Sequence, residues 1–252
     1  MNGSDFTTAV LTWYDQGHRD LPWRHTTDAY RIWISEIMLQ QTRAETVISY
    51  YERFLEKYPT VRNLAAAPEE ELLKQWEGLG YYSRARSLQK AAKMIVSEFG
   101  GELPADVKQL RSLPGIGDYT AGAVASIAFG IPAAAVDGNV ERVICRYYAI
   151  EDTVGTPAVR KMITEKTQAL VPAHRPGAFA NAMMEMGATM CTPRNPACLL
   201  CPVRETCQGF AKGIAAELPH KMPKKAQRVE NRAVLLVFCG DRVLITKRKE
   251  KL

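Results

Sequence analysis

The chain has 252 residues, of which 46% are hydrophobic and 24% are charged, so it can bury one large core or two modest ones. No window approaches eighteen uninterrupted apolar residues and no basic stretch precedes an apolar one at the N-terminus, so we expect no membrane span, no export signal and a cytoplasmic location. The net charge of +6 is carried by residues 212–252, with 11 Lys and Arg against 4 Asp and Glu. Bulk charge therefore does not establish nucleic-acid binding for the near-neutral remainder, where any basic face must come from the arrangement of side chains.

Residues 1–211 are predicted to be almost wholly helical. Apolar residues recur every three or four positions, with charges between them, in residues 29–58 and again in residues 68–79. Glu36 is the one acid in the apolar run from Ile32 to Thr42. Burial would raise the pKa of its carboxyl group, which suits a proton donor near neutral pH. Spacing alone, however, favours an ordinary solvated glutamate.

The stretch "LPGIGDYTAGAVAS" at residues 113–126 lies between two helical patterns, so it predicts helix, tight turn, helix. For an isolated Pro-Gly-x-Gly, an ordinary turn between helices is the favoured interpretation. Further along, Asp137 begins the helical segment "DGNVERVICRYYAI", where its side chain would serve as a helix cap. Asn139 fits a cap or turn position equally well.

Four of the six cysteines lie close together with the spacing C-x6-C-x2-C-x5-C, at Cys191, Cys198, Cys201 and Cys207. Four thiolates at this spacing can hold a metal centre, and disulfides are less expected in a chain without an export signal. A single zinc ion is more usually held by two closely spaced pairs. The wider gaps therefore favour a four-iron four-sulfur (4Fe-4S) cluster, with a structural zinc site as the alternative.

The composition changes near the end of the chain. Residues 217–231, "ELPHKMPKKAQRVEN", are basic and contain proline, and residues 232–249 hold two short apolar runs around Cys-Gly-Asp-Arg, which predicts a β-hairpin. A lone hairpin is marginally stable, so it is expected to belong to a larger domain. We expect a helical region at 1–219, a linker at 220–231 and the first hairpin of an incomplete domain at 232–252.

Several of these segments, in this order, resemble one known superfamily. "LPGIGDYTAGAVAS", "AVDGNVERV" and the four-cysteine loop resemble the helix-hairpin-helix DNA glycosylases of the endonuclease III class. "WISEIMLQQTR", "WEGLGYYSRARSL" and "MMEMGATMCTPRNPACLLCP" are similar to its adenine DNA glycosylase (MutY) family. The resemblance covers about residues 11–219. It implies an all-α, two-lobed glycosylase fold with an iron–sulfur loop, followed by the start of a β-rich, Nudix-like domain.

The resemblance also implies catalytic roles. Glu36 matches the acid that protonates adenine N7, Asp137 matches the carboxylate that faces C1′ of the sugar, and Asn139 matches an asparagine that helps to hold the site. Tyr119 stands where bifunctional relatives carry a lysine that attacks C1′. Tyrosine cannot form a Schiff base, so the implied enzyme is monofunctional: it releases the base and leaves an abasic site.

Further matches imply contacts with DNA. Gln41 matches a wedge that fills the space of the extruded adenine, and Tyr81 matches an aromatic residue that inserts beside the opposite 8-oxoguanine. Arg24 and Leu39 match the adenine pocket. The hairpin glycines are implied to allow backbone N–H groups to bind a DNA phosphate, at Gly115 and Gly117.

The implied function is therefore excision of adenine opposite 8-oxoguanine or guanine in base excision repair, by a nucleoid-associated monomer acting on double-stranded DNA. Two alternatives stay open. Tyrosine at position 119 is also found in mismatch thymine glycosylases of the superfamily, so a thymine or uracil mismatch glycosylase is one. A non-catalytic iron–sulfur module that binds DNA is the other.

Overall fold

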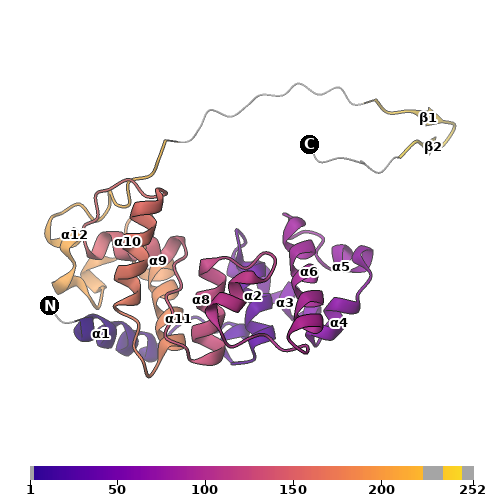
Figure 1. The fold of residues 1–252 in the computed structure, drawn as a ribbon. Helices are drawn as coiled ribbons and strands as arrows, with labels where there is room; N and C mark the ends of the chain where they lie inside the picture. The colour runs from indigo at the N-terminus through magenta and orange to yellow at the C-terminus, as the bar shows by residue number, and fades with distance from the viewer. Residues whose placement is uncertain (1–2, 224–234, 246–252) are drawn as a thin grey trace. The chain divides into compact units, whose positions relative to one another are not determined.

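The computed structural model describes residues 3–223 and 235–245 (Figure 1). The chain divides into two compact units, and the boundary in the sequence lies between Lys221 and Met222. The first unit is helical. No helix in the described ranges is long and apolar enough to cross a membrane. Its helices are α1 (Gly3–Gln16), α2 (Ala29–Leu39), α3 (Ala44–Lys57), α4 (Val61–Ala66), α5 (Glu69–Gln75), α6 (Ser83–Glu98), α7 (Val107–Ser112), α8 (Asp118–Phe129), α9 (Gly138–Tyr147), α10 (Pro157–Gln168), α11 (Pro176–Glu185) and α12 (Gln208–Ala211).

The helices begin where the sequence offers capping side chains. Asp28 accepts a hydrogen bond from the backbone N–H of Arg31 at the start of α2, at 2.8 Å. Asp106 does the same at the start of α7, where it accepts from the N–H of Gln109 at 2.9 Å. These caps fix the direction in which each helix leaves its loop, and so they place the residues one or two turns further on.

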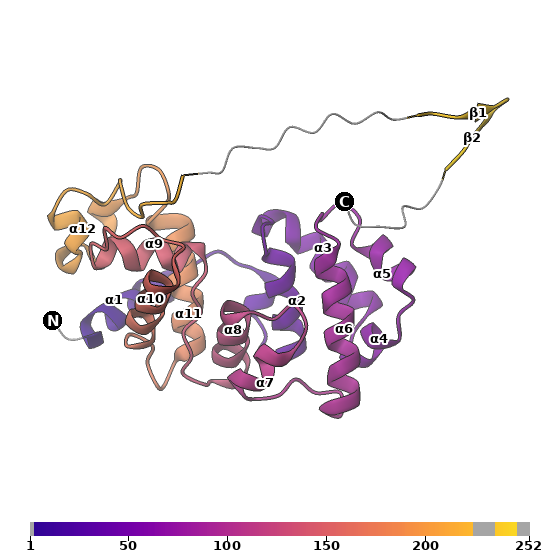
Figure 2. The ribbon, with the colours of Figure 1, turned by 45° about the horizontal axis from the view of Figure 1, so that its top comes forward.

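Two hydrophobic cores divide the helical unit into two lobes. One core lies among α2 to α8 and contains the fully buried Trp33 and Trp76. The other lies among α1, α9, α10 and α11 and contains the buried Phe6 and Phe179. In Figures 1 and 2 these two groups of helices lie on opposite sides, and α8 of the first group faces α11 of the second where the groups meet. The predicted all-α, two-lobed fold is therefore confirmed.

The lobes meet through small side chains. Ala123 on α8 and Ala180 on α11 form a separate small cluster with Ala135, which lies in the extended segment before α9. Alanine lets the two helices approach closely, and Tyr119 and Ile127 pack against the same cluster. The seam positions the ends of α2, α8 and α9 around one cleft.

The second unit contains the predicted hairpin. Strand β1 (Phe238–Cys239) pairs antiparallel with β2 (Arg242–Val243), with Phe238 opposite Val243. Gly240 in the turn has a left-handed φ of 62°. The hairpin is thus confirmed, while the larger domain remains a prediction. Most of the predicted linker, and the flanks of the hairpin at 232–234 and 246–252, lie outside the described residues.

Candidate active site

One cleft of the helical unit gathers most of the site residues expected from the sequence. It has about 1400 Å³ of empty space and is lined by residues from both lobes. Seven of the expected residues line it, namely Arg24, Glu36, Leu39, Gln41, Tyr119, Asp137 and Asn139. The other expected residues lie outside this cleft, namely Tyr81, the hairpin glycines and the four cysteines. All the expected catalytic residues are thus in one cleft, while these expected DNA contacts and metal ligands lie elsewhere.

Glu36 is a buried acid in the middle of α2. It is 3% exposed, because its neighbours Ile32 and Ile37 face the same core. Burial raises the pKa of Glu36 to about 7, and the nearby charge of Asp137 acts in the same direction. A hydrogen bond from Tyr119 opposes this shift. The solvated glutamate favoured by spacing alone is therefore wrong, and Glu36 can hold a proton near neutral pH.

Tyr119 lies in the first turn of α8, immediately after the glycine-containing turn. Its hydroxyl donates to Glu36 Oε2 at 2.5 Å and contacts Met184 Sδ at 3.0 Å. Burial, reinforced by the neighbouring carboxylates, raises the pKa of Tyr119 well above its ordinary value, so the phenol stays neutral. The basic side chains among the described residues that line the cleft are all arginines, which cannot form a Schiff base as a lysine does.

Asp137 caps α9 and faces the same cleft. Its Oδ1 accepts from the backbone N–H groups of Asn139 at 2.9 Å and Val140 at 2.8 Å, and its Oδ2 accepts from Asn139 Nδ2 at 2.8 Å. Burial raises the pKa of Asp137 above its ordinary value, and these hydrogen bonds and the charge of Arg142 offset only part of that rise. The capping interpretation is thus correct, and the cap also fixes the carboxylate in one orientation.

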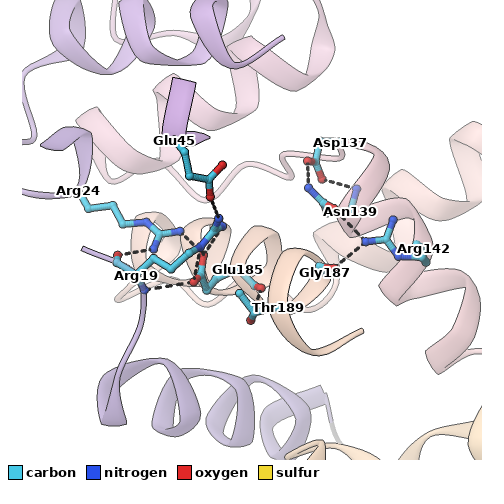
Figure 3. A network of polar contacts seen from close by, with 9 residues as sticks. All are labelled: Arg19, Arg24, Glu45, Asp137, Asn139, Arg142, Glu185, Gly187 and Thr189. Atoms are coloured by element: carbon cyan, nitrogen blue, oxygen red, sulfur yellow. Dashed lines mark hydrogen bonds and ion pairs between the residues drawn. The ribbon is translucent and has the colours of Figure 1, made fainter. Parts of the chain in front are cut away.

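Arg142 connects this cap to the four-cysteine segment, as Figure 3 shows in part. Its Nη2 donates to Asn139 Oδ1 at 2.9 Å and to the carbonyl of Gly187 at 2.7 Å, and its Nε donates to the carbonyl of Cys191 at 2.7 Å. Gly187 belongs to a π-helical turn at Met186–Met190, and a Cβ there would lie 2.5 Å from the Cβ of Asn139. Only glycine permits this close approach.

Glu185 is a buried residue that sequence reasoning missed. It is 2% exposed. Its Oε1 accepts from Arg19 Nε at 2.9 Å, and its Oε2 accepts from Arg24 Nη2 at 2.7 Å (Figure 3). Burial alone would raise the pKa of Glu185, but the hydrogen bonds from both arginines outweigh it and lower the pKa to about 2. This network fixes Arg24 at the wall of the cleft. The available signal was a single acid in the apolar run "NAMMEMG", the same signal that marked Glu36.

The two glycines of the turn between α7 and α8 have different roles. Gly115 has a left-handed φ of 80°, and a Cβ there would lie 2.7 Å from the Cβ of Ser87, so the fold itself requires glycine. Gly117 has an ordinary φ of −94°, and nothing lies within 4 Å of an added Cβ. The first turn of α8 has no side-chain cap, so its backbone N–H groups are open to an anion.

Gln41 and Tyr81 lie in two exposed loops. Both have a left-handed backbone, with φ of 59° for Gln41 and 46° for Tyr81. Tyr81 is 64% exposed, so it is not a core tyrosine. Left-handed residues other than glycine are uncommon and are typical of sites where the surroundings hold an unfavourable backbone conformation.

The four cysteines of the loop line one cavity, and none of them forms a disulfide. Arg146 donates to Cys191 Sγ at 3.4 Å. Among the residues that the structure describes, no three His, Cys, Asp or Glu side chains gather around a point that suits a single metal ion. The four thiols thus face one common space, as ligands of a shared metal centre would.

Comparisons with protein families agree with this geometry. Residues 34–171 match the family described as "HhH-GPD superfamily base excision DNA repair protein". Residues 191–207 match the "Iron-sulfur binding domain of endonuclease III". This second match begins and ends on the first and last cysteines of the loop, so the loop is an iron–sulfur binding segment.

Curated relatives and solved structures narrow the family. The human adenine DNA glycosylase is 48% identical over 81% of this chain, which spans only 39% of the human protein. The adenine DNA glycosylase of Mycolicibacterium smegmatis is 41% identical, over 82% of this chain and 71% of that protein. A thermostable thymine-DNA glycosylase superposes with a TM-score of 0.75 at 34% identity, over 83% of this chain and 97% of that chain. A trapped endonuclease III–DNA covalent intermediate superposes with a TM-score of 0.70 at 27% identity, over 85% and 99%. The chain therefore belongs to the HhH-GPD superfamily of base excision DNA repair proteins and, within it, to the adenine DNA glycosylase family.

Proposed function

We propose that this chain is a monofunctional DNA glycosylase that excises adenine paired with 8-oxoguanine or guanine. One observation carries the proposal: Glu36, Tyr119 and Asp137 line one cleft, with the Tyr119 hydroxyl bonded to Glu36. This arrangement supplies a proton donor, a neutral phenol where a nucleophilic lysine would otherwise act, and a second carboxylate. The family membership supports adenine as the base that is released.

In the proposed reaction, Glu36 protonates N7 of an adenine extruded into the cleft. Because Tyr119 donates to Oε2, the proton of Glu36 is held on Oε1, which is then the atom that donates to the base. Protonation makes adenine a better leaving group, and a donor with a pKa of about 7 is well matched to neutral pH. Arg24 and Leu39 are proposed to line the pocket of the extruded base.

Asp137 is proposed to stabilise the positive charge that develops on the sugar as the base departs. Its three hydrogen bonds from Asn139 and Val140 favour the ionised form and hold the carboxylate still. The pair thus resembles the two carboxyl groups of a glycosidase, with one protonated and one ionised. Water then adds to C1′ and leaves an abasic site.

The remaining expected residues are proposed to bind double-stranded DNA and a cofactor. The open N–H groups after Gly117 are proposed to bind a phosphate, while Gln41 and Tyr81 enter the duplex. The four cysteines of the loop are proposed to hold a 4Fe-4S cluster. A cluster bound by these cysteines would cross-link the loop, in which the carbonyl of Cys191 accepts from Arg142, the residue that also donates to Asn139 beside the cap of Asp137.

A second candidate is excision of thymine from T:G mismatches, because a thymine-DNA glycosylase superposes well on this chain. A strand-release assay separates the two functions. Duplexes with A:8-oxoguanine, A:G and T:G are incubated with the chain and then treated with alkali. We expect release at adenine from the first two duplexes, and strand cleavage only after alkali. Release at thymine alone supports the second candidate, and no release from any duplex contradicts both.

A further inference from the structure

Arg84, in the first turn of α6, joins three segments through its guanidinium group. Its Nη1 donates to the carbonyl of Met38 at 3.0 Å, and its Nη2 donates to the carbonyl of Leu79 at 2.9 Å. Its acceptors in all are oxygen atoms of Ile37, Met38, Gln40, Thr42, Leu79 and Gly80. The guanidinium carbon also lies 5.8 Å from the centre of the Tyr81 ring. A single side chain thus holds the end of α2, the loop after it and the loop before α6.

These acceptors have a shared need. The carbonyls of Ile37 and Met38 belong to the last turn of α2, where backbone oxygens lack partners within the helix. A cation at this end of a helix is also electrostatically favourable. Arg84 therefore satisfies α2 and, with the same group, fixes the residues that follow it.

The residues held in this way flank Gln41 and Tyr81. Gln40 and Thr42 are the neighbours of Gln41, and Gly80 precedes Tyr81. Both loops carry a left-handed residue other than glycine, which persists only where the surroundings impose it. Arg84 is bonded to both loops and is therefore the common support of the two strained positions.

We propose that Arg84 is a positioning residue that sets the loops of Gln41 and Tyr81 in one fixed arrangement before DNA binds. The two side chains then enter the duplex as a preformed pair. This inference rests on the proposed function, in which Gln41 replaces the extruded adenine and Tyr81 contacts the opposite base. The planar guanidinium directs its N–H groups to both loops at once, whereas the compact ammonium of lysine has three donors at one point and lacks this forked geometry. Fixing the loops in advance removes their ordering cost from base extrusion.

The test uses Arg84→Lys in the 252-residue chain, with Arg86→Lys as the matched control. Arg86 lies on the same helix and is ion-paired with Glu69 at 2.9 Å. Extrusion is measured by the fluorescence of 2-aminopurine in place of the target adenine, opposite 8-oxoguanine. We expect Arg84→Lys to weaken extrusion by about 10-fold to 100-fold, the range for losing hydrogen bonds from a charged group. Arg86→Lys is expected to match the parent.

A double-mutant cycle separates positioning from general stability. If Arg84 sets both loops, adding Gln41→Ala or Tyr81→Ala to Arg84→Lys costs little further extrusion, because the loops are already released. Adenine opposite an abasic analogue, which is less stacked, should recover most of its release rate in Arg84→Lys. Parental extrusion in Arg84→Lys, strictly additive losses, or a lower melting temperature with unchanged extrusion each overturns the inference. If the parent itself releases no adenine from any duplex, the proposed function fails instead.

Discussion

The burial of Glu36 predicts that this one carboxyl group makes the stability of the chain depend on pH. Its pKa is about 7 in the folded chain, against an ordinary value of 4.5. At about 1.4 kcal/mol for each tenfold change in proton affinity, this difference corresponds to about 3 kcal/mol. Because the folded pKa is raised, the stabilisation is fully present below pH 4.5 and is lost as the pH rises through 7.

Glu36→Gln removes this dependence, because glutamine stays neutral in the folded and unfolded chains and can still accept from Tyr119. We expect the parent to lose about 3 kcal/mol of unfolding free energy relative to Glu36→Gln between about pH 4.5 and 8. Urea unfolding of both proteins at several pH values measures the gap, with visible absorbance used to match their cluster content. The difference between the two proteins cancels the pH-dependent contributions of all other titratable groups, because both proteins contain them.

Glu185→Gln is a suitable control because Glu185 is equally buried but has a pKa lowered to about 2. With a lowered folded pKa, its stabilisation is present above the ordinary 4.5 and is lost only as the pH falls through 2. The gap between the parent and Glu185→Gln should therefore stay constant from about pH 5 to 8. A gap that is equally constant for Glu36→Gln would show that Glu36 is not a buried acid, and would remove the basis for its role as proton donor.

Three further predictions concern the proposed chemistry. Asp137→Asn should bind A:8-oxoguanine DNA like the parent but release adenine on the order of 10²-fold to 10³-fold more slowly in single-turnover assays, and parental release would exclude Asp137 from the mechanism. Tyr119→Lys places an ammonium beside Glu36, so it should ionise the acid and slow adenine release. The fraction of this lysine that has lost its proton to solvent can attack C1′ as adenine leaves, and borohydride should then reduce the Schiff base to a protein–DNA adduct that the parent does not give. Release without trapping would show that residue 119 does not reach C1′. The purified chain should be brown and contain about four irons, and a colourless protein with one zinc would contradict the cluster. Cys198→Ser should lower the iron content and the affinity for DNA more than it lowers the rate of the chemical step.

The sequence indicated the fold through local signals, because helical periodicity and capping residues such as Asp28 act within a few residues. It indicated Glu36 as a candidate, but its burial depends on the packing of α8, which begins about eighty residues later. Glu185 pairs with Arg19, which lies 166 positions away in the chain. A periodic pattern reflects only neighbouring residues, so it cannot predict such a contact. The role of Arg84 could not be predicted for another reason. Its acceptors are mostly backbone carbonyls, which every residue carries and which therefore give no signal in the sequence.

The alanine seam between the lobes has a consequence for the lifetime of the active state. Glu36 lies on α2 of one lobe, whereas Asp137 caps α9 of the other, so the reaction centre exists only while the lobes are docked. The contact through Ala123 and Ala180 includes Tyr119 and Ile127, and the buried pairs of Glu185 with Arg19 and Arg24 also join the lobes, so opening must break these contacts but leaves each hydrophobic core intact. Partial opening would separate the carboxyl groups while each lobe stays folded. Substitutions at the seam are therefore expected to reduce catalysis in chains that still resist global denaturation.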